Sequence, residues 1–532
     1  MTSHFLAIPE ELQIKILSCL DGVSVTLCAM ACKSLNEMVK SSSQLQCIVE
    51  LHLDGLVLAP PTPNVDYPRT IERLLHQRQA WMALDWGKTS AIQINGIWTT
   101  FNSGSGALAG LNVDTKHYEI VYLSTIDNAN IRPNIQRDLP DISAREIAMD
   151  MSQDLIVLLE DLTYIEPQSQ EQCHSIRLHL HSISSDGIHQ LAQHSPLEII
   201  PFRRDTPRGC VYNIQIVGKV VVVQFNSYFE SGANHGTRLY LWNWNTSDLI
   251  FDSSLSNSLN FPLSPTTMPG LEYSLMNTSL LVQTSFEDSG CIRLFQIMHS
   301  PIAQSVVVHV ATLHLPKVLP TTQVLMIFTE TGAREACPLL YTNFMQNDED
   351  RLHSFMVVYG YSDDANAPTQ LTELIVFVHQ RCLLRYAAQP PPAEDLPRDI
   401  PWEDWGPQNT RIIRSYHINR KRSGYIQGQR ALFAERVLRT NVDELHTPSS
   451  TLVVFDFSLA SAISFKQSLL PPSRILTSDV KIFEHDVETR LPCVSLTKDI
   501  GKAFDGLMMY GGGIIGINPT EDDVLSFDIF PV

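Results

Sequence analysis

Residues 8–20 read Ile-Pro-Glu-Glu-Leu-Gln-Ile-Lys-Ile-Leu-Ser-Cys-Leu, and this stretch predicts a short helix with two apolar faces. The proline pre-sets φ for a first helical turn, and the two glutamates beside it suit the positive end of a helix. At about 100° per residue, the apolar side chains divide into two groups. One side carries Leu12, Ile16, Cys19 and Leu20, and the other carries Ile14 and Leu17.

The second apolar face of this helix needs a partner. The segment 23–39 adds apolar residues at helical spacings, among them Val25, Leu27 and Met30. A few short helices in about 40 residues cannot bury two faces among themselves. We therefore expect one face to form a small local core and the other to contact a different protein or the rest of the chain.

The spacing of these residues resembles that of the F-box over residues 6–45. The run is Ile8-Pro9-x-Glu11-Leu12-x-x-x-Ile16-Leu17-x-x-Leu20-Asp21, followed by Val25, Leu27, Ala29 and Cys32-Lys33. One departure is Leu35, which stands where an aromatic residue is common in that family. The resemblance implies a three-helix module that binds a Skp-type adaptor, which links it to the cullin and RING subunits of a ubiquitin ligase. The adaptor contacts that it implies are Ile8, Pro9, Leu12, Ile14, Ile16, Leu17, Leu20, Leu27 and Cys32. The alternative is an ordinary helical cap that packs on its own chain.

The composition describes an acidic globular protein. Of its 532 residues, 44% are hydrophobic and 18% are charged, which suits a small module and one large domain. The net charge of −19 comes from 38 basic and 57 acidic side chains and argues against a nucleic acid as the main ligand. The ten cysteines form no CxxC pair, and the chain has no signal-peptide pattern and no run of 18 apolar residues. We therefore expect no membrane partner and a location in the cytoplasm, the nucleus or both.

The pattern of residues divides the chain into three parts. Residues 1–50 hold the F-box pattern, and residues 51–88 form a linker with a proline-rich connector and a helical pattern from Arg69 to Trp86. Trp81 and Trp86 favour docking of this helix, and a flexible hinge is the alternative. Residues 89–532 form a β domain, because long helical patterns give way there to short β-branched and aromatic runs between turn residues.

The short runs of the β domain recur in pairs, each pair separated by a polar loop. The pairs are 155–159 with 176–180, 220–223 with 237–241, 280–282 with 292–295, 355–358 with 374–377, and 431–433 with 452–455. The last two runs, 507–510 and 514–517, flank Gly511-Gly512-Gly513 and predict a hairpin. A long β-repeat of this kind predicts an irregular β-propeller of six to eight blades, with seven favoured. The alternative is a pair of β-sandwiches.

The sequence contains no recognisable catalytic or metal-binding pattern. HExxH, GxSxG, P-loop and EF-hand patterns are absent. The glycine-rich stretch 104–110 predicts a strand turn rather than a phosphate cradle. His179 and His181 share one strand face, but no third ligand is placed to complete a metal site. We expect no cofactor, no metal ion and no enzymatic activity.

The stretch from 387 to 422 holds the best candidates for substrate contacts. Trp402 and Trp405 lie in a proline-rich predicted loop near 387–410, and Arg420, Lys421 and Arg422 end a dense basic run that includes Arg411 and Arg414. Tryptophan and arginine are the residue types most enriched at interface hot spots. The alternatives are tryptophans that fill a gap between blades and a solvated basic hairpin or nuclear-import signal. The tryptophan loop and Arg411 also resemble, more loosely, a segment of uncharacterised fungal F-box proteins with propeller-like C-terminal regions.

These observations favour a non-catalytic substrate receptor of an SCF-type ubiquitin ligase. In this hypothesis the F-box binds the adaptor and the β domain binds a protein substrate, whose identity the sequence does not give. Two alternatives remain open. One is an F-box scaffold that acts outside a ligase, and the other is a propeller enzyme, which needs an inward cluster of acids or histidines.

Overall fold

Residues 4–53 fold into a compact set of short helices. In this computed structural model, the described residues are 4–59, 65–85, 89–93, 98–104, 106–123, 134–165, 172–198, 202–203, 209–228, 237–253, 272–298, 305–331, 344–362, 369–389, 397–414, 425–437, 449–464, 466, 468–477, 481–500, 502, 504, 506–519 and 525–531. The first helices are η1 (His4–Ala7), α1 (Glu10–Leu17), α2 (Gly22–Ala31), α3 (Lys33–Ser41) and α4 (Ser43–Leu53).

Side-chain caps and backbone breaks set the bounds of these helices. The Asp21 carboxylate accepts a hydrogen bond of 2.7 Å from the Ser24 N–H and starts α2. Cys32 is extended, with φ −158° and ψ 160°, so the apolar segment 23–39 lies in two helices, which with α1 give the three short helices expected in this module. The Ser42 hydroxyl caps α4 at the Leu45 N–H. Because α4 runs past residue 50, the helical module is longer than the predicted F-box part.

A linker helix connects the helical module to the β domain. After α4 comes the short strand β1 (Leu56–Leu58), which pairs with β21 (Phe344–Gln346). Helix α5 (Tyr67–Ala83) follows, capped by the Asp66 carboxylate and closed at Leu84 in a left-handed conformation with φ 45°. The predicted helix at 69–86 is therefore confirmed with bounds two to three residues earlier, and Trp86 lies outside the described residues.

The β domain is a seven-bladed propeller, as favoured from the sequence. Each blade is an antiparallel sheet of four strands in meander order, and blades 2 and 4 carry extra short strands. The first three blades are β3 (Thr100–Gly104), β4 (Ala107–Asn112), β5 (His117–Tyr122) and β6 (Ile135–Asp138); β7 (Ala144–Asp150), β8 (Leu155–Ile165), β9 (Gln172–Ser182), β10 (Leu197–Glu198) and β11 (Phe202–Arg203); and β12 (Gly209–Val217), β13 (Val220–Tyr228), β14 (Thr237–Asn243) and β15 (Asp248–Asp252).

The remaining blades follow the same plan, and the last one uses a strand from the start of the domain. Their strands are β16 (Tyr273–Asn277), β17 (Leu280–Ser285), β18 (Cys291–Met298), β19 (Val306–His314) and β24 (Arg398–Ile400); β20 (Thr322–Thr331), β22 (Leu352–Tyr361), β23 (Gln370–His379) and β25 (Thr410–Arg414); β26 (Ile426–Gln427), β27 (Arg430–Val437), β28 (Ser449–Asp456) and β31 (Val494–Asp499); and β32 (Gly506–Tyr510), β33 (Gly513–Pro519), β34 (Leu525–Pro531) and β2 (Ser90–Gln93). Smaller elements between or beside the blades are η2 (Asp348–Asp350), α6 (Gln380–Ala388), α7 (Trp402–Asn409), α8 (Leu459–Ser464) and the pair β29 (Ser473–Ile475) and β30 (Val487–Thr489).

The strand pairs predicted from the sequence repeat are adjacent strands of single blades. Leu159 pairs with Leu178 in β8 and β9, Val223 pairs with Tyr240 in β13 and β14, and Val454 pairs with Leu432 in β28 and β27. The predicted C-terminal hairpin is confirmed, since Tyr510 pairs with Gly513. The glycine-rich stretch 104–110 is the turn from β3 to β4, in which Gly106 takes φ +75°.

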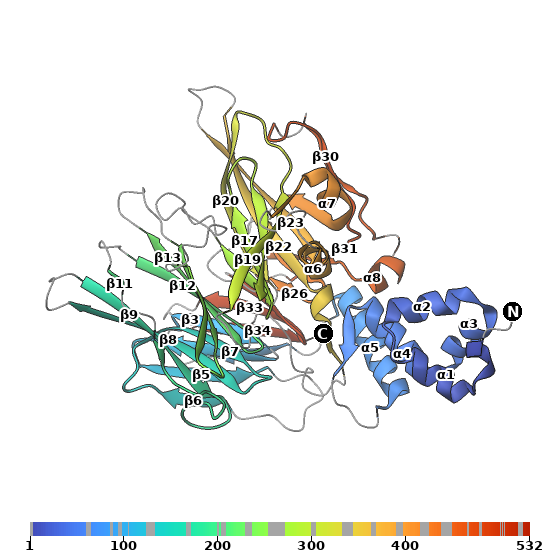
Figure 1. The fold of residues 1–532 in the computed structure, drawn as a ribbon, viewed down its shortest axis with the longest axis horizontal. Coiled ribbons are helices and arrows are strands. Elements are labelled where there is room, and N and C mark those ends of the chain that lie inside the picture. The colour runs from blue at the N-terminus through green and yellow to red at the C-terminus, as the bar shows by residue number, and fades with distance from the viewer. Residues whose placement is uncertain are drawn as a thin grey trace, which may run out of the picture.

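The core of the propeller lies between its blades. Each of the seven interfaces between neighbouring blades has its own buried apolar cluster. Blades 7 and 1 meet through Trp98, Leu108 and Val121 on one side and Ile515 and Phe527 on the other. Because β2 pairs antiparallel with β34, the two ends of the domain are joined and the ring is closed. Figure 1 shows the helical module at one side of this β domain, with α5 next to the strands.

Candidate functional site

Several large apolar side chains of α1, of α2 and of the turn between them face solvent. The exposed fractions are 51% for Leu12, 48% for Ile16, 38% for Leu20 and 60% for Leu27. Several large apolar side chains left exposed in one small module indicate an interaction site. We call Leu12, Ile16, Leu20 and Leu27, together with Val23 and Met30, the exposed apolar row.

The other predicted adaptor contacts are less exposed. Leu17 is 3% exposed and packs with Val25 in the core of the helical module, and Ile14 packs against the same core. Ile8 and Cys32 are partly buried, and Pro9 is exposed one residue before α1 begins. The predicted two-faced helix is therefore present, with Leu12 and Ile16 on the solvent side and Leu17 on the core side. Leu17 is a core residue here rather than a contact available to an adaptor.

Two exposed residues were not among the predicted contacts. Val23 is 46% exposed and Met30 is 78% exposed, and both lie on α2 with Leu27. The spacing of four and then three residues places all three on one side of a helix. That spacing was the signal that could have found them.

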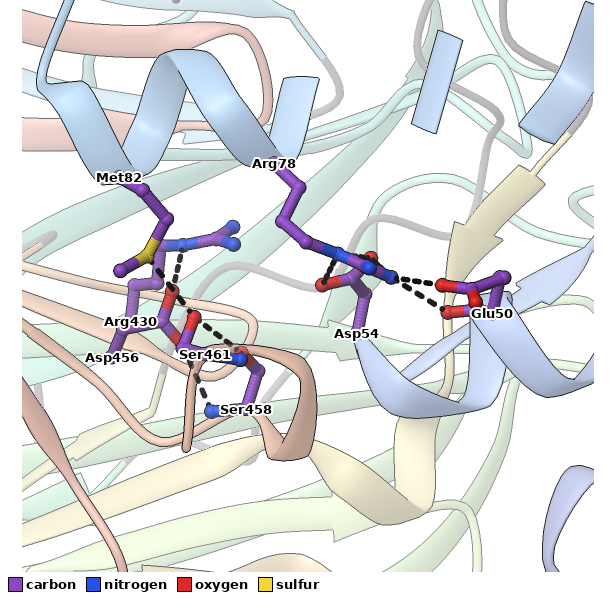
Figure 2. A network of polar contacts seen from close by, with 8 residues as sticks. All are labelled: Glu50, Asp54, Arg78, Met82, Arg430, Asp456, Ser458 and Ser461. Carbon is purple, nitrogen blue, oxygen red and sulfur yellow. Dashed lines mark hydrogen bonds and ion pairs between the residues drawn. The ribbon is translucent and has the colours of Figure 1, made fainter. Parts of the chain in front are cut away.

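A polar network ties the helical module to the linker helix (Figure 2). The Arg78 guanidinium of α5 lies 2.8 Å from an Asp54 carboxylate oxygen and 2.8 Å from a Glu50 carboxylate oxygen. The Arg78 and Asp54 side chains are 11% and 4% exposed. Burial raises the pKa of the Asp54 carboxyl, and the Arg78 guanidinium opposes that shift. Arg78 thus supplies the charge that compensates a buried acid at the end of α4.

The same helix is built into the propeller. Trp81 and Leu84 of the linker pack with Leu432 and Leu452 of blade 6 and Met509 of blade 7. The Arg430 guanidinium lies 4.9 Å from the centroid of the Trp81 ring, and its Nε donates to the Asp456 carboxylate at 2.8 Å. The predicted docking of Trp81 is therefore confirmed. A β domain that starts at residue 89, as predicted, leaves out Trp81 and Leu84, whose side chains belong to the interface between blades 6 and 7.

A second set of contacts comes from α8. The Ser461 hydroxyl donates to the Met82 sulfur of α5 at 3.3 Å and accepts from the Ser458 hydroxyl at 2.9 Å (Figure 2). The Lys498 ammonium donates to the Leu84 carbonyl. We call the contact region of α4, β1 and α5 with the propeller the joint. Because β1 also pairs with β21, the joint has contacts to blades 5, 6 and 7. These contacts hold the helical module in one orientation on the propeller.

Arg78→Ala should lower the free energy of unfolding by about 3 kcal/mol, because it leaves the buried Asp54 carboxylate without its partner. The value lies at the low end for a broken buried ion pair because Glu50 is 31% exposed. Thermal and chemical denaturation of the full chain measure it. Arg69→Ala is the matched control, since Arg69 is exposed on the same helix. A loss for Arg78→Ala no larger than that for Arg69→Ala would show that the ion pairs contribute nothing to the joint.

Trp402 and Trp405 fill a gap between blades, which was the alternative to a substrate-binding role, and their predicted role as substrate contacts is wrong. The expected loop at 387–410 holds β24 and helix α7, and the two indoles are 6% and 0% exposed. They pack edge to face at 5.2 Å inside the core between blades 4 and 5, and the Trp405 Nε1–H donates to the His314 carbonyl at 2.8 Å. The indoles are the largest apolar side chains of α7, and they fill the core between this helix and the strands of blades 4 and 5.

The basic run is divided in the structure. Arg411 lies in β25 with 4% exposure, and burial lowers the pKa of its guanidinium. Arg414 ends the same strand and is exposed. Arg420, Lys421 and Arg422 lie outside the described residues. The predicted docking role is therefore excluded for Arg411 and stays a prediction for the other three.

Within the ranges that the structure describes, no three His, Cys, Asp or Glu side chains are grouped as a metal site would require. No described helix is both long enough and apolar enough to span a membrane.

The architecture is that of a helical module followed by a seven-bladed propeller, and comparison with known families identifies the module. Residues 5–46 match the F-box domain. The N-terminal module is therefore an F-box domain, as the sequence spacing predicted, and α4 extends beyond the match.

Comparisons with whole proteins add nothing to this assignment. No curated protein matches the chain. Among solved structures, the chain is similar to the WD40 domain of SCAP from fission yeast, with 7% identity and a TM-score of 0.32 over 90% of this chain and 98% of that one. It is also similar to the extracellular domains 1-2 of Drosophila Semaphorin 1b, with 8% identity and a TM-score of 0.31 over 83% and 86% of the two chains.

Proposed function

We propose that this protein is a non-catalytic substrate receptor of an SCF-type ubiquitin ligase. The F-box domain binds a Skp-type adaptor and, through it, the cullin and RING subunits, while the propeller binds a protein substrate. The observation that carries the proposal is the exposed apolar row of the F-box domain, combined with the fixed joint to a large β domain. Apolar side chains of two short helices suit a groove on a partner protein.

In this proposal, the protein contributes positioning rather than chemistry. A substrate held on the propeller stays near a conjugating enzyme that other subunits supply, so ubiquitin transfer becomes effectively intramolecular. A joint that holds one orientation favours this role, because a freely rotating linker lowers the effective concentration of the substrate at the reacting centre. The protein needs no cofactor or metal of its own for this role.

We also propose that it works in the cytoplasm, the nucleus or both. The seven described cysteines are free thiols, and four of them are buried: Cys47, Cys291, Cys382 and Cys493. Proteins with unpaired core thiols are typical of reducing compartments.

The direct test is affinity purification with the full chain as bait, followed by mass spectrometry. Wild type is compared with the double variant Leu12→Asp and Ile16→Asp. We expect adaptor, cullin and RING subunits to disappear from the variant sample while proteins bound through the propeller remain. Adaptor without cullin or RING in the wild-type sample supports the scaffold alternative instead, and identical samples reject the proposed role of the F-box domain.

The basic residues at 420–422 provide a separate test of substrate binding. Reversing the charge of Arg420, Lys421 and Arg422 should leave the melting temperature nearly unchanged. Substitutions of solvated side chains usually change the free energy of unfolding by less than about 0.5 kcal/mol. If these side chains hold an acidic segment of a substrate, specific proteins should vanish from a proximity-labelling list while adaptor binding persists. An unchanged list shows that substrates bind elsewhere.

A further inference from the structure

Helix α8 presents two large apolar side chains to solvent. Leu459 and Ile463 are 37% and 58% exposed, and their spacing of four residues places them on one face of the helix. Ala460 and Ser461, which lie on another side, are 1% and 0% exposed. The helix therefore buries one side in the protein and leaves an apolar side open. We call Leu459 and Ile463 the α8 face.

Hydrogen bonds on the buried side of α8 fix the position of the helix. The Ser458 N–H donates to the Asp456 carboxylate at 2.8 Å, and that buried carboxylate is paired with Arg430. The Ser461 hydroxyl donates to the Met82 sulfur of α5 at 3.3 Å (Figure 2). Because these bonds already order the helix, a partner that packs on the α8 face loses little free energy in ordering it.

The α8 face lies close to the F-box domain. Helix α8 packs against α4 as well as α5, and Figure 1 shows it where the helical module meets the propeller. Helix α4 also contacts the start of α2, since a Cβ added to Gly22 would lie 2.3 Å from the His52 Cβ. Packed helix axes lie about 8–10 Å apart and α4 is about 16 Å long, so α8 lies within about 25 Å of the start of α2.

The exposed apolar row has side chains at this same end of the F-box domain. Leu20 and Val23, on either side of the turn into α2, are 38% and 46% exposed. A protein interface of standard size buries about 800 Å² on each partner, which is a patch about 30 Å across. An adaptor seated on the exposed apolar row is therefore large enough to reach the α8 face.

We propose that the Skp-type adaptor also contacts the propeller directly, through Leu459 and Ile463. The inference rests on the proposed function, because it needs an adaptor on the exposed apolar row. The adaptor is the occupant of the α8 face because this face adjoins the surface on which the adaptor is seated. A partner that touches both sides of the joint holds the propeller in one orientation relative to the ligase, which adds to the polar network of Arg78.

Calorimetric titration of purified adaptor into the full chain tests this contact. Leu459→Asp with Ile463→Asp places two charges in the interface and should weaken adaptor binding by about tenfold or more. Leu459→Ser with Ile463→Ser adds no charge and should weaken binding by about threefold to tenfold. The melting temperatures should stay close to that of wild type, since both side chains are exposed in the free chain.

Three controls separate contact from general effects. Ile188→Asp with Leu191→Asp adds the same two charges to side chains of blade 2 that are 58% and 64% exposed, and adaptor binding should not change. Ile463→Leu keeps an apolar side chain of equal size and should bind as wild type does. In about 0.5 M salt, where long-range repulsion is screened, the loss in the Leu459 and Ile463 variants should persist.

The pattern of results separates this inference from the F-box proposal. Wild-type affinity in both Leu459 and Ile463 variants, with binding lost in Leu12→Asp with Ile16→Asp, overturns the inference and leaves the F-box proposal standing. In that case, loss of other co-purified proteins assigns the α8 face to a substrate, and loss of self-association in sedimentation assigns it to a second copy of the chain. Absence of adaptor binding by wild type rejects the F-box proposal itself and this inference with it.

Discussion

Leu12→Asp combined with Ile16→Asp should weaken binding to a Skp-type adaptor by about a thousandfold while the protein stays folded. Both side chains are about half exposed in the free chain, so the aspartates meet water there. In a complex they would be buried against an apolar groove, where a charge is strongly unfavourable. Losing two central contacts of an interface costs at least about 4 kcal/mol, which corresponds to that factor. Calorimetric titration of purified adaptor into the full chain measures it.

Two controls distinguish lost binding from lost folding. Leu191→Asp places the same charge on a leucine that is 64% exposed on blade 2, and it should leave adaptor binding unchanged. Leu17→Asp places a charge in the F-box core instead, and it should melt the helical module and remove binding indirectly. Undiminished binding by the Leu12 and Ile16 double variant, with an unchanged melting temperature, contradicts adaptor docking on the exposed apolar row.

The strands of this propeller could be predicted because their signals are local. A continuous apolar run such as Leu155 to Leu159 indicates a strand buried on both faces, and a glycine turn such as Gly511 to Gly513 indicates a reversal of the chain. Pairing of Leu159 with Leu178 then needs only that neighbouring strands pair in sequence order. The same local logic predicted the two faces of α1.

The position of a side chain between blades could not be predicted in this way. Trp402 and Trp405 have the composition of an interface hot spot, and only the packing of α7 against blades 4 and 5 shows that they are core residues. A cavity beside α5 is a stronger case. Its lining includes Gln346, Gln427 and Tyr510, which come from three separate blades or their connections, and nothing near them in the sequence signals that they line one cavity. Contacts between segments that are far apart in the sequence can be recognised only once the fold is known.

Ending the chain at Asp505 should abolish cooperative unfolding of the propeller. The truncation removes β32, β33 and β34, and with them the strand on which β2 pairs. It exposes the faces of blades 1 and 6, whose apolar side chains include Trp98, Leu108, Val121, Leu432, Leu452 and Val454. Leaving these side chains in water costs about 10 kcal/mol, which is comparable to the whole stability of a domain. Scanning calorimetry measures it, and a sharp transition like that of the full chain contradicts closure of the ring.

Closure of the propeller ring can also be tested by adding a disulfide bond between β2 and β34. Gln93 of β2 and Ser526 of β34 are direct antiparallel partners, and such pairs bring Cα atoms to about 4.5–5.5 Å, which is within the range of a disulfide. Gln93→Cys with Ser526→Cys should therefore stabilise the oxidised protein by about 2–4 kcal/mol, because the bond joins two ends of the domain that separate on unfolding.

The reduced form of the same protein is the matched control, and it should melt close to wild type. Because the closed loop contains more than 400 residues, the gain should lie at the upper end of that range if the ring opens at β2 and β34 on unfolding. Each single cysteine variant should show no dependence on oxidation within one chain. Failure of the bond to form under oxidising conditions, in a chain that folds normally, would mean that β2 does not close the seventh blade and that the F-box end and the C-terminal blade are not joined in one ring.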